Sequence, residues 1–336
     1  MFTSISMPRC IWYVKLTNIL ELTSSGKSTE ITQTYFCQGQ SLKIYQVKSL
    51  YRDGSPTIIE NPTCQVSTVS SEAAGGTPLA TVVHYDGPGV PTVHLFYLDK
   101  SYNIREVIWV NGEQTAHNNL SLKAARNSDL SVIYWRQDKT TTCMRLYFQA
   151  EDGSIQEYDR AGSGPWTKGV FFNFDASSTH THEKPHAGTS LSFINLSLEE
   201  PNIRGFWQAE ASNAIVEGSS QGLDWSIRGR TVEVFPSHVP IAAAWEGKRP
   251  NTNTAFYHVT NGDIYKTVIG DSPQKINTTP TDQGSRIAVT VAPSDGGVHI
   301  ITSGNQHIIR RVFPKNGRAW RDPIRITLES SSPLAN

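Results

Sequence analysis

Three polar side chains stand among aromatic and aliphatic residues in this sequence. Lys15 lies in IWYVKLT, His84 in TVVHY and Arg136 in SVIYWR. An unpaired polar group in a dry core is costly, so such side chains are normally hydrogen-bonded or in contact with water. These three residues, together with Tyr134 beside Arg136, are therefore candidates to line a central pocket.

Aromatic residues accompany these donors in the same segments. Trp12, Tyr13, Trp135 and Trp245 are candidates for a surface that binds an apolar small molecule. Packing of Tyr85, Trp135 and Trp245 in the core is the alternative, because large aromatic side chains dominate protein interiors.

A histidine-rich segment, THTHEKPH, contains His180, His182 and His186. A His-x-His pair is able to bind a borderline metal, but no nearby Cys or patterned Asp completes a ligand set, which favours a solvated loop. The sequence also lacks a Gly-x-Ser-x-Gly nucleophile, a phosphate-binding glycine loop and a dinucleotide fingerprint. We therefore predict neither a metal nor a cofactor.

The elements that position these residues come from a repeat of about fifty residues. Six copies share an aromatic strand, a Gly/Asn/Asp turn and a second strand, and they begin near Thr34, Leu95, Leu146, Gly205, Ala255 and His299. An apolar segment precedes each copy, and a fourth strand follows it. This length is typical of a propeller blade. We predict an all-β fold, a six-bladed β-propeller with four antiparallel strands per blade, and one domain over residues 1–336.

In this arrangement the apolar segments are the innermost strands of the blades. They begin near Trp12, Thr81, Ser131, Ser192, Ile241 and Ile287.

The composition excludes some partners. The 30 basic and 30 acidic residues give a net charge of zero, and no basic run indicates a nucleic-acid surface. Pro8 and Arg9 interrupt the apolar N-terminal segment, so we expect neither a signal peptide nor a membrane span, and a cytoplasmic location. A homodimer is compatible with the sequence.

The third copy, MRLYFQAEDGSIQEYDRAGSGPWTKG, resembles the blade motif of the fungal fucose-specific lectins. The resemblance extends weakly over all six copies. It implies sugar sites between adjacent blades, where Arg and Glu hydrogen-bond the fucose and aromatic rings cover its apolar face. A fucosylated glycan is then the expected partner.

Carried over residue by residue, the resemblance implies two retained sets. Arg145, Glu157 and Trp166 match in the third copy, and Arg204, Glu217 and Trp225 match in the fourth. The other four copies depart from the motif at the Arg position, the Glu position or both, through Gln33 and Ile44, His94 beside a retained Glu106, Thr254 and Lys266, and Val298 and Arg310. The alternative for each retained pair is an ordinary cross-strand ion pair.

Loss of four sites weakens the multivalency on which lectins depend. The sequence is similar in this pattern to the fungal hetero-Diels–Alderases of tropolone sesquiterpenoid biosynthesis. That likeness implies an enzyme without a cofactor, which joins a tropolone quinone methide to a sesquiterpene alkene by holding both in an aromatic pocket. It also implies one catalytic donor to the substrate carbonyl, for which the candidates are His84, Lys15, Arg136 and Tyr134. This activity on a polyketide or terpenoid substrate is the leading hypothesis, and a fucose-binding lectin with fewer sugar sites is the alternative.

Overall fold

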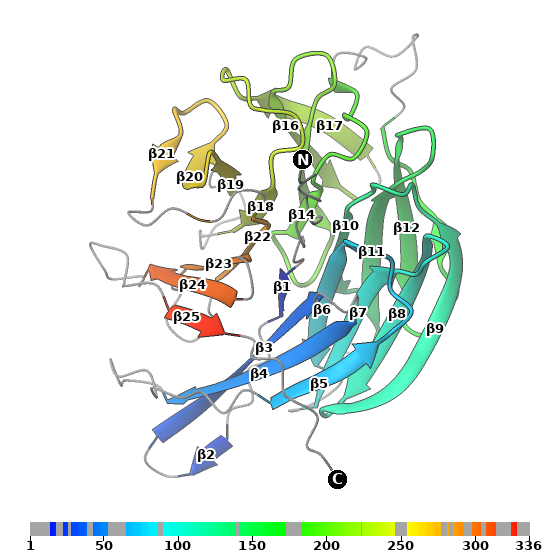
Figure 1. Ribbon diagram of the computed structural model, residues 1–336. Coiled ribbons are helices and arrows are strands. Elements are labelled where there is room, and N and C mark those ends of the chain that lie inside the picture. The colour runs from blue at the N-terminus through cyan, green and yellow to red at the C-terminus, as the bar shows by residue number, and fades with distance from the viewer. Residues whose placement is uncertain are drawn as a thin grey trace, which may run out of the picture.

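The computed structural model describes residues 14–17, 23–25, 28–38, 43–52, 65–85, 90–138, 141–172, 183–222, 224–245, 254–276, 281, 285–291, 298–303, 307–313 and 324–327. These residues form six antiparallel sheets (Figure 1). No helix among them is long and apolar enough to cross a membrane.

The first three sheets follow one another along the chain. The first contains β1 (Val14–Thr17), β2 (Thr23–Ser25), β3 (Ser28–Gln38), β4 (Ile44–Arg52) and β5 (Gln65–Ser70). The second contains β6 (Leu79–Tyr85), β7 (Pro91–Leu98), β8 (Asn103–Val110) and β9 (Glu113–Lys123). The third contains β10 (Leu130–Arg136), β11 (Thr142–Gln149), β12 (Ile155–Ala161) and β13 (Thr167–Lys168).

The last three sheets repeat the same order. The fourth contains β14 (Ser192–Asn195), β15 (Asn202–Gln208), β16 (Ile215–Gln221) and β17 (Asp224–Arg230). The fifth contains β18 (Ile241–Ala244), β19 (Ala255–Thr260), β20 (Asp263–Val268) and β21 (Gln274–Lys275). The sixth contains β22 (Ile287–Val291), β23 (Val298–Ser303), β24 (His307–Phe313) and β25 (Ile324–Thr327).

The sheets form a closed ring, in agreement with the predicted six-bladed propeller. The innermost strands β1, β6, β10, β14, β18 and β22 each contact the corresponding strand of both neighbouring sheets, and the contact of β22 with β1 closes the circle (Figure 1). Five sheets have the predicted four strands. The first differs, because the short strand β2 pairs with β3 as a fifth. The extent of the domain over residues 1–336 stays a prediction.

Apolar side chains on both faces of each sheet hold the ring together. Along β7, Phe96 and Leu98 pack against the third sheet, whereas Leu95 and Tyr97 pack against the first. This alternation follows from the two-residue period of a strand. Burying one such side chain contributes about 1.5–3 kcal/mol, so the interfaces between sheets supply the core that no single blade has.

A repeated glutamine fixes the passage from one sheet to the next. Gln149 donates to the carbonyls of Gly153 and His186 and accepts from the N–H of Gly188, and Gln208 bonds the following connection in the same way through His238. Gln38 does so in the first sheet. These glutamines give a common reference position for comparing the blades.

Candidate functional site

The polar side chains that the sequence singles out gather at the interfaces between neighbouring sheets. We name each site by one residue. The Arg145 site lies between the third and fourth sheets, the His94 site between the second and third, and the Arg204 site between the fourth and fifth. At each site, one side chain on the second strand of a blade and a glutamate on its third strand face the next sheet.

At the Arg145 site, the guanidinium of Arg145 is held by three groups. Its Nε donates to the Asp159 carboxylate, its Nη1 donates to the carbonyl of Gly222 at 2.9 Å, and Nη1 lies 3.8 Å from Oε2 of Glu157. The guanidinium carbon also lies 5.2 Å from the centroid of the Trp135 ring, within cation–π range. The arginine is thereby fixed in one orientation.

Glu157 keeps one oxygen uncommitted at this site. The indole N–H of Trp225, from the fourth sheet, donates to Oε2 at 3.1 Å, while the buried Oε1 has no hydrogen-bond partner in the described part of the chain. Gly169 leaves space beside this oxygen, since a Cβ atom there would lie 2.6 Å from Oε1. A buried acceptor without a partner costs free energy that a ligand hydroxyl would recover.

Burial raises the pKa of Glu157 to about 7, although the positive charge of Arg145 opposes this shift.

Aromatic rings surround the pair on the fourth-sheet side. Trp225 meets Phe171 with ring centroids 4.9 Å apart and Tyr147 edge to face at 6.1 Å. The site thus combines fixed hydrogen-bonding groups with an aromatic wall.

Trp166 and Trp225 do not lie beside the Arg and Glu of their own copies of the repeat, where the resemblance had placed them. Each sits beside the Glu of the preceding blade, so Trp225 joins Arg145 and Glu157 rather than Arg204 and Glu217. Trp166 joins Glu106 of the second sheet, where it packs edge to face against Phe96 at 5.8 Å.

The His94 site is filled by groups of the protein itself. Arg160, from the third sheet, donates to both oxygens of Glu106 at 2.7 and 2.9 Å, and its guanidinium lies over the Trp166 ring at 4.6 Å. His94 Nδ1 lies 2.8 Å from the same carboxylate. Although burial alone acts in the opposite direction, the bonds from His94 and Arg160 lower the pKa of Glu106 to about 2.

His84 belongs to this same site, and its role as a catalytic donor stays a prediction. It is 4% exposed, its Nε2 lies 3.0 Å from Nε2 of His94, and its Nδ1 lies 3.4 Å from the Thr142 hydroxyl. Every ring nitrogen is satisfied if His94 donates to Glu106 and His84 donates to His94.

The other candidate residues on the innermost strands do not lie together at one site. Tyr134 is partly buried near His84, with ring centroids 6.3 Å apart, whereas the exposed Arg136 donates to the carbonyl of Tyr85 at 2.6 Å. Trp135 belongs to the Arg145 site. Trp245 is partly exposed and its buried indole N–H has no partner among the described residues. Trp12, Tyr13, the side chain of Lys15, His180 and His182 lie outside the described residues.

The Arg204 site is simpler. Nε of Arg204 lies 3.4 Å from Oε1 of Glu217, and Nε of Arg228 lies 3.5 Å from the same oxygen. Burial raises the pKa of Glu217 against both positive charges. Ile269, just after β20 of the fifth sheet, packs into this interface close to Gly229.

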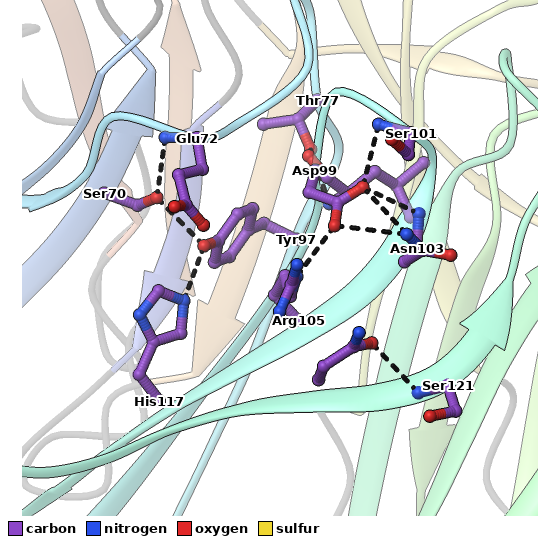
Figure 2. Close-up of polar contacts among 12 residues, drawn as sticks. Ser70, Glu72, Thr77, Tyr97, Asp99, Ser101, Asn103, Arg105, His117 and Ser121 are labelled. Atoms are coloured by element: carbon purple, nitrogen blue, oxygen red, sulfur yellow. Dashed lines mark hydrogen bonds and ion pairs between the residues drawn. The ribbon is translucent and has the colours of Figure 1, made fainter.

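The interface between the first and second sheets carries a different network. The Tyr97 hydroxyl lies 2.9 Å from that of Ser70 and 2.7 Å from Nε2 of His117 (Figure 2). Asp99 accepts from the backbone N–H groups of Ser101 and Asn103 and, at 2.7 Å, from Nε of Arg105 on β8. These bonds brace the hairpin. No cluster of three or more metal-ligating side chains occurs in the ranges that the structure covers.

Strand register corrects the alignment of the first copy. Phe36, two residues before Gln38, pairs with Gln46, as Tyr147, two residues before Gln149, pairs with Glu157. The first sheet therefore places Thr34 and Gln46, rather than Gln33 and Ile44, at the Arg and Glu positions.

Sequence reasoning missed Arg160 and Asp159, which carry charge at two of these sites. Arg160 stands three residues after Glu157, and because side chains alternate along a strand, it faces the preceding sheet. Counting three residues beyond each Glu position would have found it.

Comparisons with known proteins agree with this geometry. The sequence model described as fungal fucose-specific lectin matches residues 65–300. The fucose-specific lectin g276 of Arthrobotrys oligospora is 36% identical over 254 residues, which are 73% of this chain and 65% of that protein. The chain thus spans just under two thirds of this relative's length.

Solved structures support the fold. AofleA from Arthrobotrys oligospora superposes with a TM-score of 0.73 at 20% identity, covering 95% of this chain and 88% of that one. A mutant of Aleuria aurantia lectin in complex with α-methyl-L-fucoside gives a TM-score of 0.71 at 17% identity, covering 96% and 97%. Another structure of that lectin is described as a six-bladed β-propeller.

Proposed function

The chain belongs to the fungal fucose-specific lectin family, and from this premise we propose that it binds a fucose-type sugar, as part of a glycan, at the Arg145 site. One observation carries the proposal. Arg145, Glu157 and Trp225 come from two adjacent sheets and meet at one site, with a buried carboxylate oxygen left free.

The groups at this site suit a neutral sugar. Charged donors and acceptors form directional bonds to hydroxyl groups, each worth about 1.5–3 kcal/mol. Arg145 is positioned to donate and Oε1 of Glu157 to accept. The aromatic wall of Trp225 and Phe171 is able to cover the C–H groups of a sugar face, and a methyl group such as that of fucose gains from burial there.

The Arg204 site is a weaker candidate for the same ligand. It retains the Arg and Glu pair, but Ile269 packs into the interface and Arg228 adds a second cation at Glu217. We therefore expect weaker binding here than at the Arg145 site.

The pericyclase hypothesis gains no observation of its own. Of its predicted donors, His84 is bonded within the His94 site and Arg136 is exposed on the surface. The family match favours the lectin alternative over the cyclase. Catalysis on a polyketide or terpenoid substrate, a homodimer and a cytoplasmic location stay predictions.

Calorimetric titration with methyl α-L-fucoside tests the proposal. We expect one stronger site, lost in Arg145→Ala and retained in Arg230→Ala, a matched removal of an exposed arginine on β17. Methyl α-L-galactoside, which carries an extra hydroxyl in place of a hydrogen on the methyl group, should bind more weakly. Absence of heat from the fucoside at millimolar concentration would refute the proposal.

A further inference from the structure

The position three residues after the Glu position differs from blade to blade. In the second to fifth sheets it holds Trp109, Arg160, Ser220 and Ile269. Because three is an odd number of residues, this side chain faces the preceding sheet and enters the site that the preceding blade builds. We call it the gate position.

Large side chains at the gate position fill the sites they enter. Trp109 packs on Phe36 of the first sheet with ring centroids 5.2 Å apart. Ile269 packs into the interface with the fourth sheet, where it lies 2.8 Å from the position of a Cβ on Gly229. Ser220, the smallest of the four, enters the Arg145 site, where its hydroxyl donates to the nearby carbonyl of Gly222.

Arg160 fills the His94 site with hydrogen-bonding groups. Its guanidinium takes both oxygens of Glu106 and lies on the face of Trp166. In the Arg145 site, Oε1 of Glu157 accepts no hydrogen bond from any described residue, and the equivalent tryptophan, Trp225, donates to Oε2. In keeping with this difference, the buried Trp166 N–H has no partner among the described residues.

We infer that Arg160 is an internal plug that closes a third, latent sugar site built from Glu106 and Trp166, and that the gate position decides which interfaces bind. The inference rests on the proposed function for its ligand class, the 6-deoxyhexose of the Arg145 site. The plug itself rests on contacts that involve no sugar.

The closed state is stabilised by three interactions. A bidentate guanidinium–carboxylate pair is among the stronger hydrogen-bonded contacts in proteins, and Glu106 is fully buried. The ring of Trp166 adds a cation–π contact. A sugar that entered would have to displace all three, so the wild-type protein keeps this site closed.

An exchange of two residues between the sites tests the inference. His94→Arg with Arg160→Ser gives the His94 site the arginine and serine of the Arg145 site. Arg145→His with Ser220→Arg makes the reverse change and serves as the matched control. Each double variant keeps one cation beside the buried glutamate, which protects the fold.

The first readout uses no sugar. In ¹H–¹⁵N spectra of the indole groups, the Trp166 N–H should shift downfield in the first double variant, because Glu106 becomes free to accept it. The Trp225 signal should lose its downfield position in the reverse variant. An unmoved Trp166 signal in a folded protein would overturn the plug.

The second readout is the number of methyl α-L-fucoside molecules bound in calorimetry. It should rise by one in the first variant, with an affinity within about tenfold of the Arg145 site, and fall by one in the reverse variant. A Trp166 signal that shifts without a new site would overturn the latent sugar site, even if wild-type binding is intact. If no variant binds fucoside, the proposed function and the ligand class both fail, while the indole readout still decides the plug.

Discussion

The Arg145 and His94 sites are two versions of one local structure with opposite electrostatics. By strand register, Trp135 holds the position in the third sheet that His84 holds in the second, and Arg145 holds that of His94. Ser220 in the fourth sheet likewise holds the position of Arg160 in the third. In the first site burial raises the pKa of the glutamate to about 7, and in the second two hydrogen-bonding partners overcome burial and lower it to about 2.

This contrast shows how a repeat can lose a binding site without losing stability. The His94 site satisfies its buried carboxylate internally through Arg160 and His94. In the Arg145 site, Oε1 of Glu157 has no hydrogen-bond partner among the described residues. Satisfied polar groups stabilise a fold, whereas unsatisfied ones mark the place where a ligand contributes.

The largest difference should appear in stability. Arg160→Ala leaves Glu106 buried without its main partner, and breaking a buried pair costs about 3–5 kcal/mol. Arg145→Ala should cost less, because Glu157 with a pKa near 7 takes up a proton readily. Urea unfolding at pH 6 measures the free energy of unfolding of each variant. Equal losses of stability in the two variants would contradict the difference in ionisation between Glu106 and Glu157.

For sugar affinity we expect the opposite order, with the larger effect from Arg145→Ala. Arg145→Ala removes a charged donor from the proposed ligand contacts, so the affinity for methyl α-L-fucoside should fall on the order of 100-fold. Arg160→Ala should leave the affinity of the Arg145 site unchanged. Calorimetry on both variants measures the two affinities. If Arg160→Ala lowered the affinity and Arg145→Ala did not, the sugar would bind at the His94 site rather than at the Arg145 site.

The pH dependence of binding should report Glu157. Its side chain faces Arg145, Asp159, Tyr147 and the indole of Trp225. A carboxylate with a pKa of about 7 is ionised mainly above that pH, so if the ionised form accepts the sugar hydroxyl, affinity should weaken about tenfold from pH 8 to pH 6. The residual binding of Glu157→Gln should not change over this range. Tighter binding at pH 6 would mean that the protonated acid is the competent form.

The smallest effect concerns the indole N–H of Trp225. Trp225→Phe keeps an aromatic ring but removes one hydrogen bond to Glu157, which contributes about 1 kcal/mol, or roughly fivefold in affinity. Trp166→Phe should have no effect on binding, since Trp166 belongs to the closed site. Titration of the two variants side by side distinguishes the open site from the closed one.

Sequence reasoning predicted the ring of sheets because its signals are local and repeated. The innermost strands begin where expected at Ser192, Ile241 and Ile287, and the alternation of apolar residues follows the two faces of each sheet. The Arg145–Glu157 pair is also close in sequence. These features depend on strand period and turn chemistry, which a single repeat displays.

The composition of each site was harder to predict because it depends on neighbouring sheets. Trp225 and Glu157 are 68 residues apart, and Arg160 and Glu106 are 54 apart. Within one repeat, Arg160 resembles an ordinary surface residue of a hairpin. Only the packing of two sheets shows that it faces Glu106, and that His84 faces His94.

A crystal structure with methyl α-L-fucoside at saturating concentration tests the central claim most directly. The account predicts a sugar bonded to Arg145 and to Oε1 of Glu157 with one face against Trp225, and the Arg160–Glu106 pair intact beside Trp166. A sugar seated on Glu106 with Arg160 displaced, or an Arg145 site without sugar, would contradict it.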